Sequence, residues 1–250
     1  MTPIVAVSLK MYFDRARTLD YCRAVAEIAR KSAAVQGGAV RLAVLPDHLT
    51  LAAAAEVLEG SVALLGAQDL AHEDRGAFTG EVSGADIAAL GAQIVEVGHA
   101  ERRSIFKEDD AMVAAKTAAA LRNGLIPLLC IGEAERAEDP ADAAAACAAQ
   151  VRSAVGNEET DAEVWLAYEP YWAIGAPAPA PAEYVRAVCD ALRAQVAGLL
   201  PNASLVYGGS AGPGLLAQLH PSVDGLFLGR FAHDPAALAQ VVNDAARLAR

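Results

Sequence analysis

The chain has 250 residues, 54% of them hydrophobic, and a formal net charge of −11 at pH 7. That charge disfavours nucleic acid and anionic membranes as partners, because the electrostatic attraction that dominates such binding would become repulsion. The longest strongly apolar run, residues 125–131, is far shorter than the roughly 18 residues of a membrane helix, so we expect a soluble protein. The N-terminal segment lacks the features of a signal peptide, which makes the cytoplasm the default location.

The cysteines are widely spaced, at Cys22, Cys130, Cys147 and Cys189. They form no CxxC motif, and no histidine lies at metal-ligand spacing from them. We therefore expect reduced, mostly buried thiols and no metal site.

Short apolar runs alternate with longer alanine-rich segments. The runs predict eight strands, over residues 4–8, 41–45, 62–68, 94–98, 125–131, 164–169, 205–209 and 226–229. The segments between them have helical spacing, over residues 15–33, 47–59, 108–123, 139–155, 181–198 and 234–249, with shorter helices at 83–91 and 212–219. Length alone fits one domain or two, but a strand followed by a helix eight times, without a long linker, favours parallel strands covered by helices. We expect one α/β domain over residues 1–250, closed as a (β/α)8 barrel.

Polar residues and glycines follow the predicted strands. In such a barrel the loops after the strands build the functional site. In chain order these positions hold Ser8 and Lys10, Asp47, Gln68, His99 and Glu101, Gly132 and Glu133, Glu169, Gly208 to Ser210, Gly229 and Arg230. We therefore expect the site at this rim.

Glu169 is the candidate catalytic base. It lies in the stretch AYEPYWAIGAPAPAP (167–181), directly after a predicted strand. Pro170 restricts Glu169 to extended backbone angles, and three further prolines stiffen the far side, so the stretch is typical of a lid hinged at both ends. The alternative is a helix-capping or salt-bridged carboxylate, and the proline-rich lid favours catalysis over it.

Lys10 and His99 are candidates to act with this base. Lys10 lies just beyond the first strand, where its ammonium could meet a phosphate or a developing oxyanion; the alternative is a solvated lysine. His99 directly follows the fourth strand, where a single histidine is more often structural. Carboxylate, imidazole and ammonium together suit proton transfer between carbons beside a carbonyl, as base, electrophile and cation. That chemistry requires no metal and no organic cofactor, so we predict neither.

Two glycine-bearing loops, YGGSAGPG (207–214) and LGRF (228–231), end the last two strands and precede helices. Such loops often bind phosphate, because backbone N–H groups approach the oxygens closely and a helix N-terminus adds positive potential. For a lone glycine pair the alternative is a tight turn. The candidate phosphate-binding residues are Gly209, Ser210, Gly229 and Arg230, with Gly175 of the lid as a further source of N–H.

Five stretches occur in the order of one known family: GAQDLAHEDRGAFTGEVS (66–83), VGHAERR (97–103), CIGE (130–133), AYEPYWAIG (167–175) and YGGS (207–210). On these motifs the chain resembles the triosephosphate isomerase family from end to end. The resemblance implies a TIM-type (β/α)8 barrel in which Glu169 shuttles the proton and His99 is a neutral electrophile. It also implies that Lys10 is the cation and that Glu101 is its ion-pair partner.

The resemblance further implies a homodimer. Residues 72–80 would reach into the neighbouring subunit, and Thr79, near the tip of this loop, would approach the neighbour's site. The alternative is an ordinary exposed surface loop.

Some positions depart from the family pattern. Ser8 stands where the family typically has asparagine, so space is gained near the substrate carbonyl and an amide donor is lost. Ala100 replaces the serine that would hold the resting glutamate, and Arg230 replaces a glycine, where it could clamp the phosphate or point outward. Residues 176–178 read Ala, Pro, Ala in place of Thr, Gly, Lys, which stiffens the distal hinge.

We therefore hypothesise a cofactor-free isomerase of a short sugar phosphate that acts through an enediol. Triose phosphate (glyceraldehyde 3-phosphate or dihydroxyacetone phosphate) and a four-carbon erythrulose phosphate both remain open as substrate. One rival is a barrel that binds a sugar phosphate without turning it over. Another is a synthase or aldolase, in which Lys10 would form a Schiff base.

Overall fold

The computed structural model describes residues 2–174 and 179–249. Within them eight parallel strands pair in chain order, and β1 pairs with both β2 and β8, so the sheet closes into a barrel. The strands are β1 (Ile4–Ser8), β2 (Arg41–Leu45), β3 (Leu64–Ala67), β4 (Ile94–Val97), β5 (Ile126–Ile131), β6 (Trp165–Tyr168), β7 (Ser204–Tyr207) and β8 (Gly225–Leu228). The predicted (β/α)8 barrel is confirmed.

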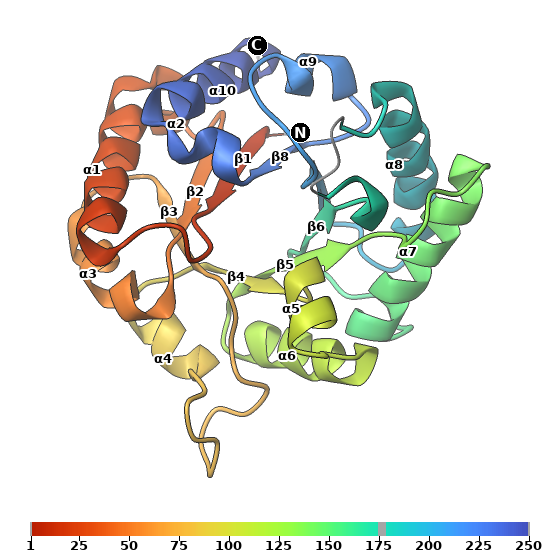
Figure 1. The fold of residues 1–250 in the computed structure, drawn as a ribbon, viewed down its shortest axis with the longest axis horizontal. Helices are drawn as coiled ribbons and strands as arrows, with labels where there is room; N and C mark the ends of the chain where they lie inside the picture. Colours follow the sequence, from red (N-terminus) through yellow and green to blue (C-terminus); the bar gives the residue numbers. More distant parts are fainter. Residues whose placement is uncertain (1, 175–178, 250) are drawn as a thin grey trace.

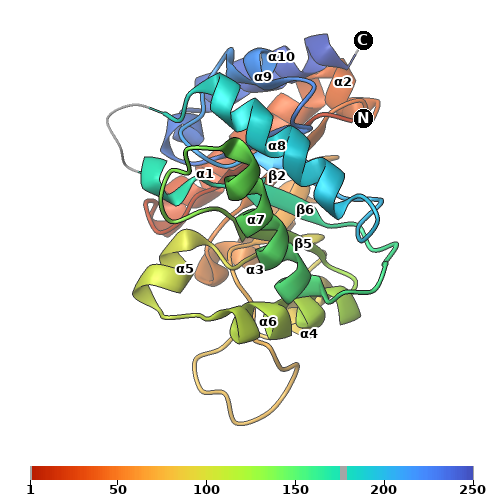
Figure 2. The same cartoon turned by 90° about the vertical axis from the view of Figure 1, so that its right-hand side faces the viewer.

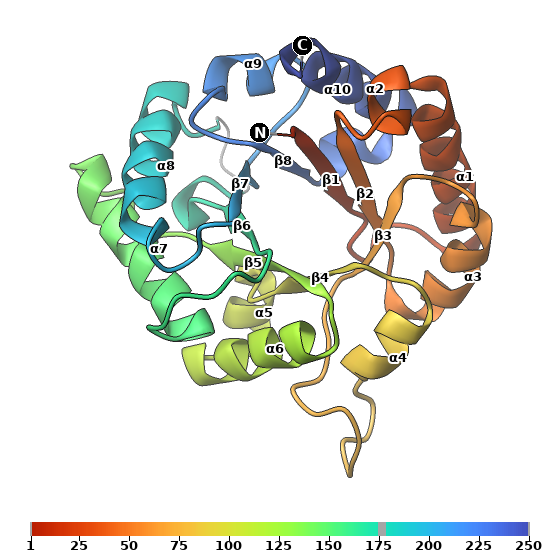
Figure 3. The same cartoon turned by 180° about the vertical axis from the view of Figure 1, so that it is seen from behind.

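Helices surround the strands as a ring in both end views (Figures 1 and 3). They are α1 (Arg15–Lys31), α2 (Ala33–Gln36), α3 (His48–Leu58), α4 (Gly84–Ala89), α5 (Ala100–Ile105), α6 (Asp110–Arg122), α7 (Pro140–Val155), α8 (Ala182–Val196), α9 (Leu215–Leu219) and α10 (Pro235–Leu248), with the short 3-10 helices η1 (Tyr171–Ala173) and η2 (Arg230–His233). No helix in the described ranges is long and apolar enough to cross a membrane.

Two helical features differ from the sequence prediction. The helix expected at 15–33 is interrupted at Ser32, whose side chain accepts a hydrogen bond from the Val35 N–H and so begins α2. Helix α5 was not predicted at all. It begins after His99, which accepts the Glu101 N–H with a ring nitrogen, and histidine is not among the side chains usually found at a helix N-cap.

The barrel interior is filled by alternate residues of the strands. This inner cluster consists of Ile4, Ala6, Ala43, Leu45, Ile94, Leu128, Cys130, Trp165, Ala167, Val206 and Phe227. Strand side chains alternate between the two faces, so the residues two positions after Ala6, Ile94 and Ala167 also face inward. Those residues are Ser8, Glu96 and Glu169, and they place polar groups above the apolar interior, toward the carboxyl ends of the strands.

The segment between β3 and α4 projects away from the barrel in all three views (Figures 1, 2 and 3). It contains residues 72–80. Ion pairs join its Asp74 to Arg122 at 3.0 Å and its Arg75 to Asp86 at 2.8 Å, so they tie it to α6 and α4. Phe78 near its tip is 39% exposed, which leaves an apolar ring on a projecting loop.

Candidate active site

Lys10, His99 and Glu169, which lie far apart in the sequence, come together at the carboxyl-end rim. The Lys10 Nζ lies 3.2 Å from the His99 Nε2, and a Glu169 carboxylate oxygen lies 3.6 Å from the same nitrogen. One imidazole nitrogen is therefore close to both the ammonium and the carboxylate. The three candidate catalytic groups face one small space.

The surroundings of His99 determine which of its nitrogens carries the proton. Its Nδ1 accepts the backbone N–H of Glu101 at 3.0 Å, so the neutral ring carries its proton on Nε2. Burial, followed by the charge of Lys10, lowers the His99 pKa to about 4. At neutral pH the ring is thus a neutral donor. Because the Lys10 ammonium is also a donor, the two groups cannot hydrogen-bond to each other, and both are free to donate to one ligand acceptor.

Lys10 is held from two sides. Its Nζ donates to Glu101 at 2.9 Å, and the Gln68 side chain donates to its backbone carbonyl at 3.0 Å. Its φ of 49° lies in the left-handed region, so the turn after β1 is strained at this residue. Burial lowers the Lys10 pKa, but the hydrogen bond and charge of Glu101 outweigh it, and the net pKa is raised. The lysine is therefore a fixed cation rather than the freely solvated side chain of the alternative interpretation.

Glu169 follows β6 and is only 2% exposed. Its carboxylate makes no ion pair with a lysine or arginine among the described residues, and its Oε2 has no hydrogen-bond partner there. Burial and then the charge of Glu96 raise the Glu169 pKa to about 8, although Lys10 acts in the opposite direction. A Cβ on residue 208 would lie 2.7 Å from the Glu169 Cγ, so any residue larger than glycine there would displace the Glu169 side chain. The result is a basic, tightly positioned carboxylate.

Glu133 anchors the described residues at the start of the predicted lid. One carboxylate oxygen of Glu133 accepts hydrogen bonds from Tyr168 at 3.0 Å, Trp172 at 2.7 Å and Tyr184 at 3.1 Å. These donors come from β6, η1 and α8, and the Tyr171 N–H also donates to the Glu133 carbonyl. The backbone on either side of Glu169 is thereby fixed.

A cavity of about 460 Å³ opens over these groups. Its lining includes Ser8, Lys10, His99, Glu169, Gly209, Ser210, Gly229 and Arg230. Arg230 itself is exposed at the rim, with its guanidinium carbon 5.7 Å from the Tyr12 ring centre. Of the other predicted positions, Gly175 lies outside the described residues. Thr79 is exposed in the projecting loop and does not line this cavity.

A second cavity, of about 470 Å³, adjoins the first and shares Ser8, Lys10, His99 and Glu101 with it. It exposes a residue that the sequence analysis missed. Glu96 of β4 faces this cavity, is 4% exposed, and has an oxygen 3.9 Å from the His99 Nε2. The sequence signal for it is a lone charge within the apolar strand IVEV.

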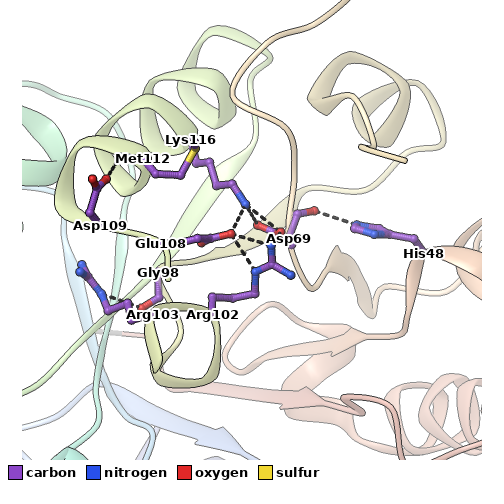
Figure 4. A network of polar contacts seen from close by, with 9 residues as sticks. All are labelled: His48, Asp69, Gly98, Arg102, Arg103, Glu108, Asp109, Met112 and Lys116. Atoms are coloured by element: carbon purple, nitrogen blue, oxygen red, sulfur yellow. Dashed lines mark hydrogen bonds and ion pairs between the residues drawn. The ribbon is translucent and has the colours of Figure 1, made fainter. Parts of the chain in front are cut away.

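A partly buried ion-pair network holds α5, and with it His99, in place (Figure 4). Arg102 of α5 contacts Asp69 at 2.9 Å and Glu108 at 2.6 Å. Lys116 of α6 bridges the same two acids, at 2.7 and 2.6 Å. Arg103 donates to the Gly98 carbonyl at 3.1 Å, so both arginines restrain the turn that carries the imidazole.

The chemistry open to this arrangement is proton transfer between neighbouring carbons. A basic carboxylate, a neutral imidazole donor and an ammonium face a cavity that residues of the two glycine loops also line. Together the fold and the rim define an acid–base enzyme built on a (β/α)8 barrel.

The chain belongs to the triosephosphate isomerase family, whose model matches residues 3–245, and it is an isomerase. The L-erythrulose-1-phosphate isomerase of Pectobacterium atrosepticum is 48% identical over 247 residues, which cover 96% of this chain and 95% of that protein. The triosephosphate isomerase of Symbiobacterium thermophilum is 37% identical over 254 residues, covering 98% and 97%. The crystal structure of triosephosphate isomerase from Bartonella henselae matches with a TM-score of 0.84 at 26% identity, covering 99% of this chain and 100% of that one. The resemblance inferred from the sequence motifs is confirmed.

Proposed function

We propose that the chain isomerises L-erythrulose 1-phosphate, the four-carbon alternative left open by the sequence. The observation that carries the proposal is the 48% identity to a relative of that name over almost the whole of both chains, against 37% for the triosephosphate isomerase relative. Ser8 supports it, because a side chain smaller than asparagine leaves room beside the reacting carbons.

The proposed reaction moves a carbonyl by one carbon. Glu169 removes the proton from C3, and the electrons of that bond form the C2=C3 double bond of an enediolate. The negative charge on O2 is held by Lys10 and by the Nε2–H of His99. Return of a proton to C2 and transfer of the O3 proton to O2 leave the carbonyl at C3, which is erythrulose 4-phosphate. C2 is reduced as C3 is oxidised, so no co-reactant is consumed.

The phosphate is proposed to lie against the two glycine loops. Gly209 and Ser210 follow β7, Gly229 and Arg230 follow β8, and all four line the same cavity as Glu169. Backbone N–H groups at such positions bind phosphate oxygens closely, and Arg230 adds positive charge at the rim. This placement leaves the reacting carbons beside Lys10 and His99.

We also propose that the whole chain acts as one domain and as a cytoplasmic homodimer, with residues 72–80 of each subunit reaching the other and Thr79 approaching the neighbour's site. The projecting loop supports this arrangement. So do the exposed apolar side chains Met11, Ile105 and Phe106, which line the second cavity beside the active site. Light scattering on the purified protein measures the subunit number, and a monomer at assay concentration would contradict the dimer.

The test of the substrate is proton NMR in D₂O with purified protein. We expect loss of the C3 proton signal of L-erythrulose 1-phosphate and appearance of erythrulose 4-phosphate, with a kcat/KM well above that on glyceraldehyde 3-phosphate. Glu169→Gln, which keeps the shape and removes the base, should abolish the exchange. Faster turnover of triose phosphate than of the four-carbon compound would refute the proposed substrate. It would indicate that triose phosphate is the substrate instead.

A further inference from the structure

Glu96 is a buried acid that the proposed reaction does not yet use. It lies two residues after Ile94, which is part of the apolar barrel interior, so its side chain enters the barrel directly below the reaction space. It faces the same imidazole nitrogen as the base: its nearer oxygen is 3.9 Å from the His99 Nε2, and that of Glu169 is 3.6 Å away. A ligand that extends past that nitrogen from the first cavity into the second therefore meets Glu96.

The polar atoms around Glu96 are incompletely bonded. Among the described residues, the Glu96 Oε2 and the Ser8 Oγ are buried and have no hydrogen-bond partner of ordinary geometry, although the Ser8 hydroxyl lies close enough to Glu96 to lower its pKa. Both residues line the second cavity, and Ser8 lines the first as well. Buried polar groups in folded proteins are nearly always hydrogen-bonded, so a carboxyl and a hydroxyl that face one cavity with only each other as hydrogen-bonding neighbours among the described residues have spare bonding capacity for a polar ligand group.

The charged groups around Glu96 indicate which kind of ligand group it would bind. Lys10, Glu101, Glu169, Asp69 and His99 face it. Burial raises the pKa of both Glu96 and Glu169 to about 8, against the effect of Lys10, so these neighbouring acids do not readily ionise together; the proposed reaction needs Glu169 as the carboxylate, which leaves the proton on Glu96. A protonated carboxyl and a serine hydroxyl each donate one hydrogen bond and accept others. They match a neutral hydroxyl group rather than a cation or a second phosphate.

We propose that Glu96 and Ser8 form the subsite for the terminal hydroxymethyl group of a four-carbon sugar phosphate, the group that a triose phosphate lacks. This rests on the proposed function, in which C3 is the carbon that loses its proton. C4 lies one bond, about 1.5 Å, from C3. It must therefore lie beside the groups that surround C3, and Ser8 in place of a larger side chain opens that direction. Glu96 thereby favours a four-carbon substrate over a triose phosphate.

The proposal is tested by the ratio of kcat/KM on L-erythrulose 1-phosphate to that on glyceraldehyde 3-phosphate. Glu96→Val, which continues the apolar strand, should lower this ratio by about 10- to 100-fold, because the hydroxymethyl group loses its partner. Glu96→Gln, which can still donate and accept, should keep most of it. Glu101→Gln is the matched control: it also neutralises an acid beside Lys10 and should slow both substrates alike. Circular dichroism and melting curves verify that each variant folds.

An unchanged ratio in Glu96→Val would overturn the subsite, and an equal loss on both substrates would assign Glu96 a general structural role instead. Failure of the proposed reaction itself is distinguished by inhibition with the unreactive polyols erythritol 4-phosphate and glycerol 3-phosphate. The parent protein could fail to turn over L-erythrulose 1-phosphate and still be inhibited more strongly by erythritol 4-phosphate than by glycerol 3-phosphate. If Glu96→Val removes that difference, the subsite is supported and the proposed reaction is refuted. Equal inhibition by the two polyols in parent and variant would refute the subsite.

Discussion

Shortening the proposed catalytic carboxylate by one methylene group tests the placement of Glu169 most directly. Glu169→Asp withdraws the carboxylate by about 1.5 Å, one carbon–carbon bond. The side chain cannot slide forward to compensate, because it is buried and because its Cγ packs tightly against Gly208. A misplacement of about 1 Å costs about 10²-fold in rate, so we expect kcat to fall by about 10²- to 10³-fold, or about 2.7–4 kcal/mol of barrier.

The assay for this variant measures kcat and KM separately on L-erythrulose 1-phosphate. KM should change little, since in the proposed function the glycine loops that line the cavity, and not the base, bind the phosphate. Glu158→Asp, the same change at an exposed loop position between α7 and β6, is the control and should leave both constants as they are. A loss of kcat below about threefold, or an effect confined to KM, would refute Glu169 as the base.

Three further predictions concern pH, stability and packing. Burial raises the Glu96 pKa from 4.5 to about 8, so the stability this carboxyl contributes is complete below about pH 4.5 and is lost as pH rises toward 8. Glu96→Gln should therefore gain melting temperature over the parent between about pH 5 and 9, and a constant difference would contradict this. Lys116→Met leaves Asp69 without a bridging ammonium and should lower the free energy of unfolding in urea by about 3–5 kcal/mol; a loss below 1 kcal/mol would show that Arg102 alone suffices. Gly208→Ala should displace Glu169 and lower kcat more than tenfold, and wild-type kinetics would show that the base is not held there.

Much of the architecture could be predicted from the sequence because the strands and helices differ clearly in length and composition. The positions of Lys10, His99 and Glu169 followed from one rule, that loops after parallel strands meet at one rim. Helix α5 could not be predicted, because its first turn is capped by an imidazole and held by Arg102 through a tertiary ion pair.

Glu96 could not be interpreted from the strand pattern for a different reason. Parallel strands are buried on both faces, so their sequences are apolar throughout and do not mark which residues enter the barrel. Only closure of the barrel shows that Ile94 and Glu96 face inward while Val95 and Val97 face the helices. Arg230 is a related case, since the sequence showed the departure from glycine and the structure was needed to place its side chain at the exposed rim.

The single oxygen of Glu133 that accepts three hydrogen bonds has a consequence for how this enzyme can diverge. Tyr168, Trp172 and Tyr184 all depend on that atom, so replacing Glu133 leaves three donors to satisfy at once. Substitutions of Glu133 and its three donors are therefore expected to be strongly epistatic: each is tolerated only when the others change with it. A lid transplanted from another member of the family should function here only if its own acceptor and donors are transplanted with it.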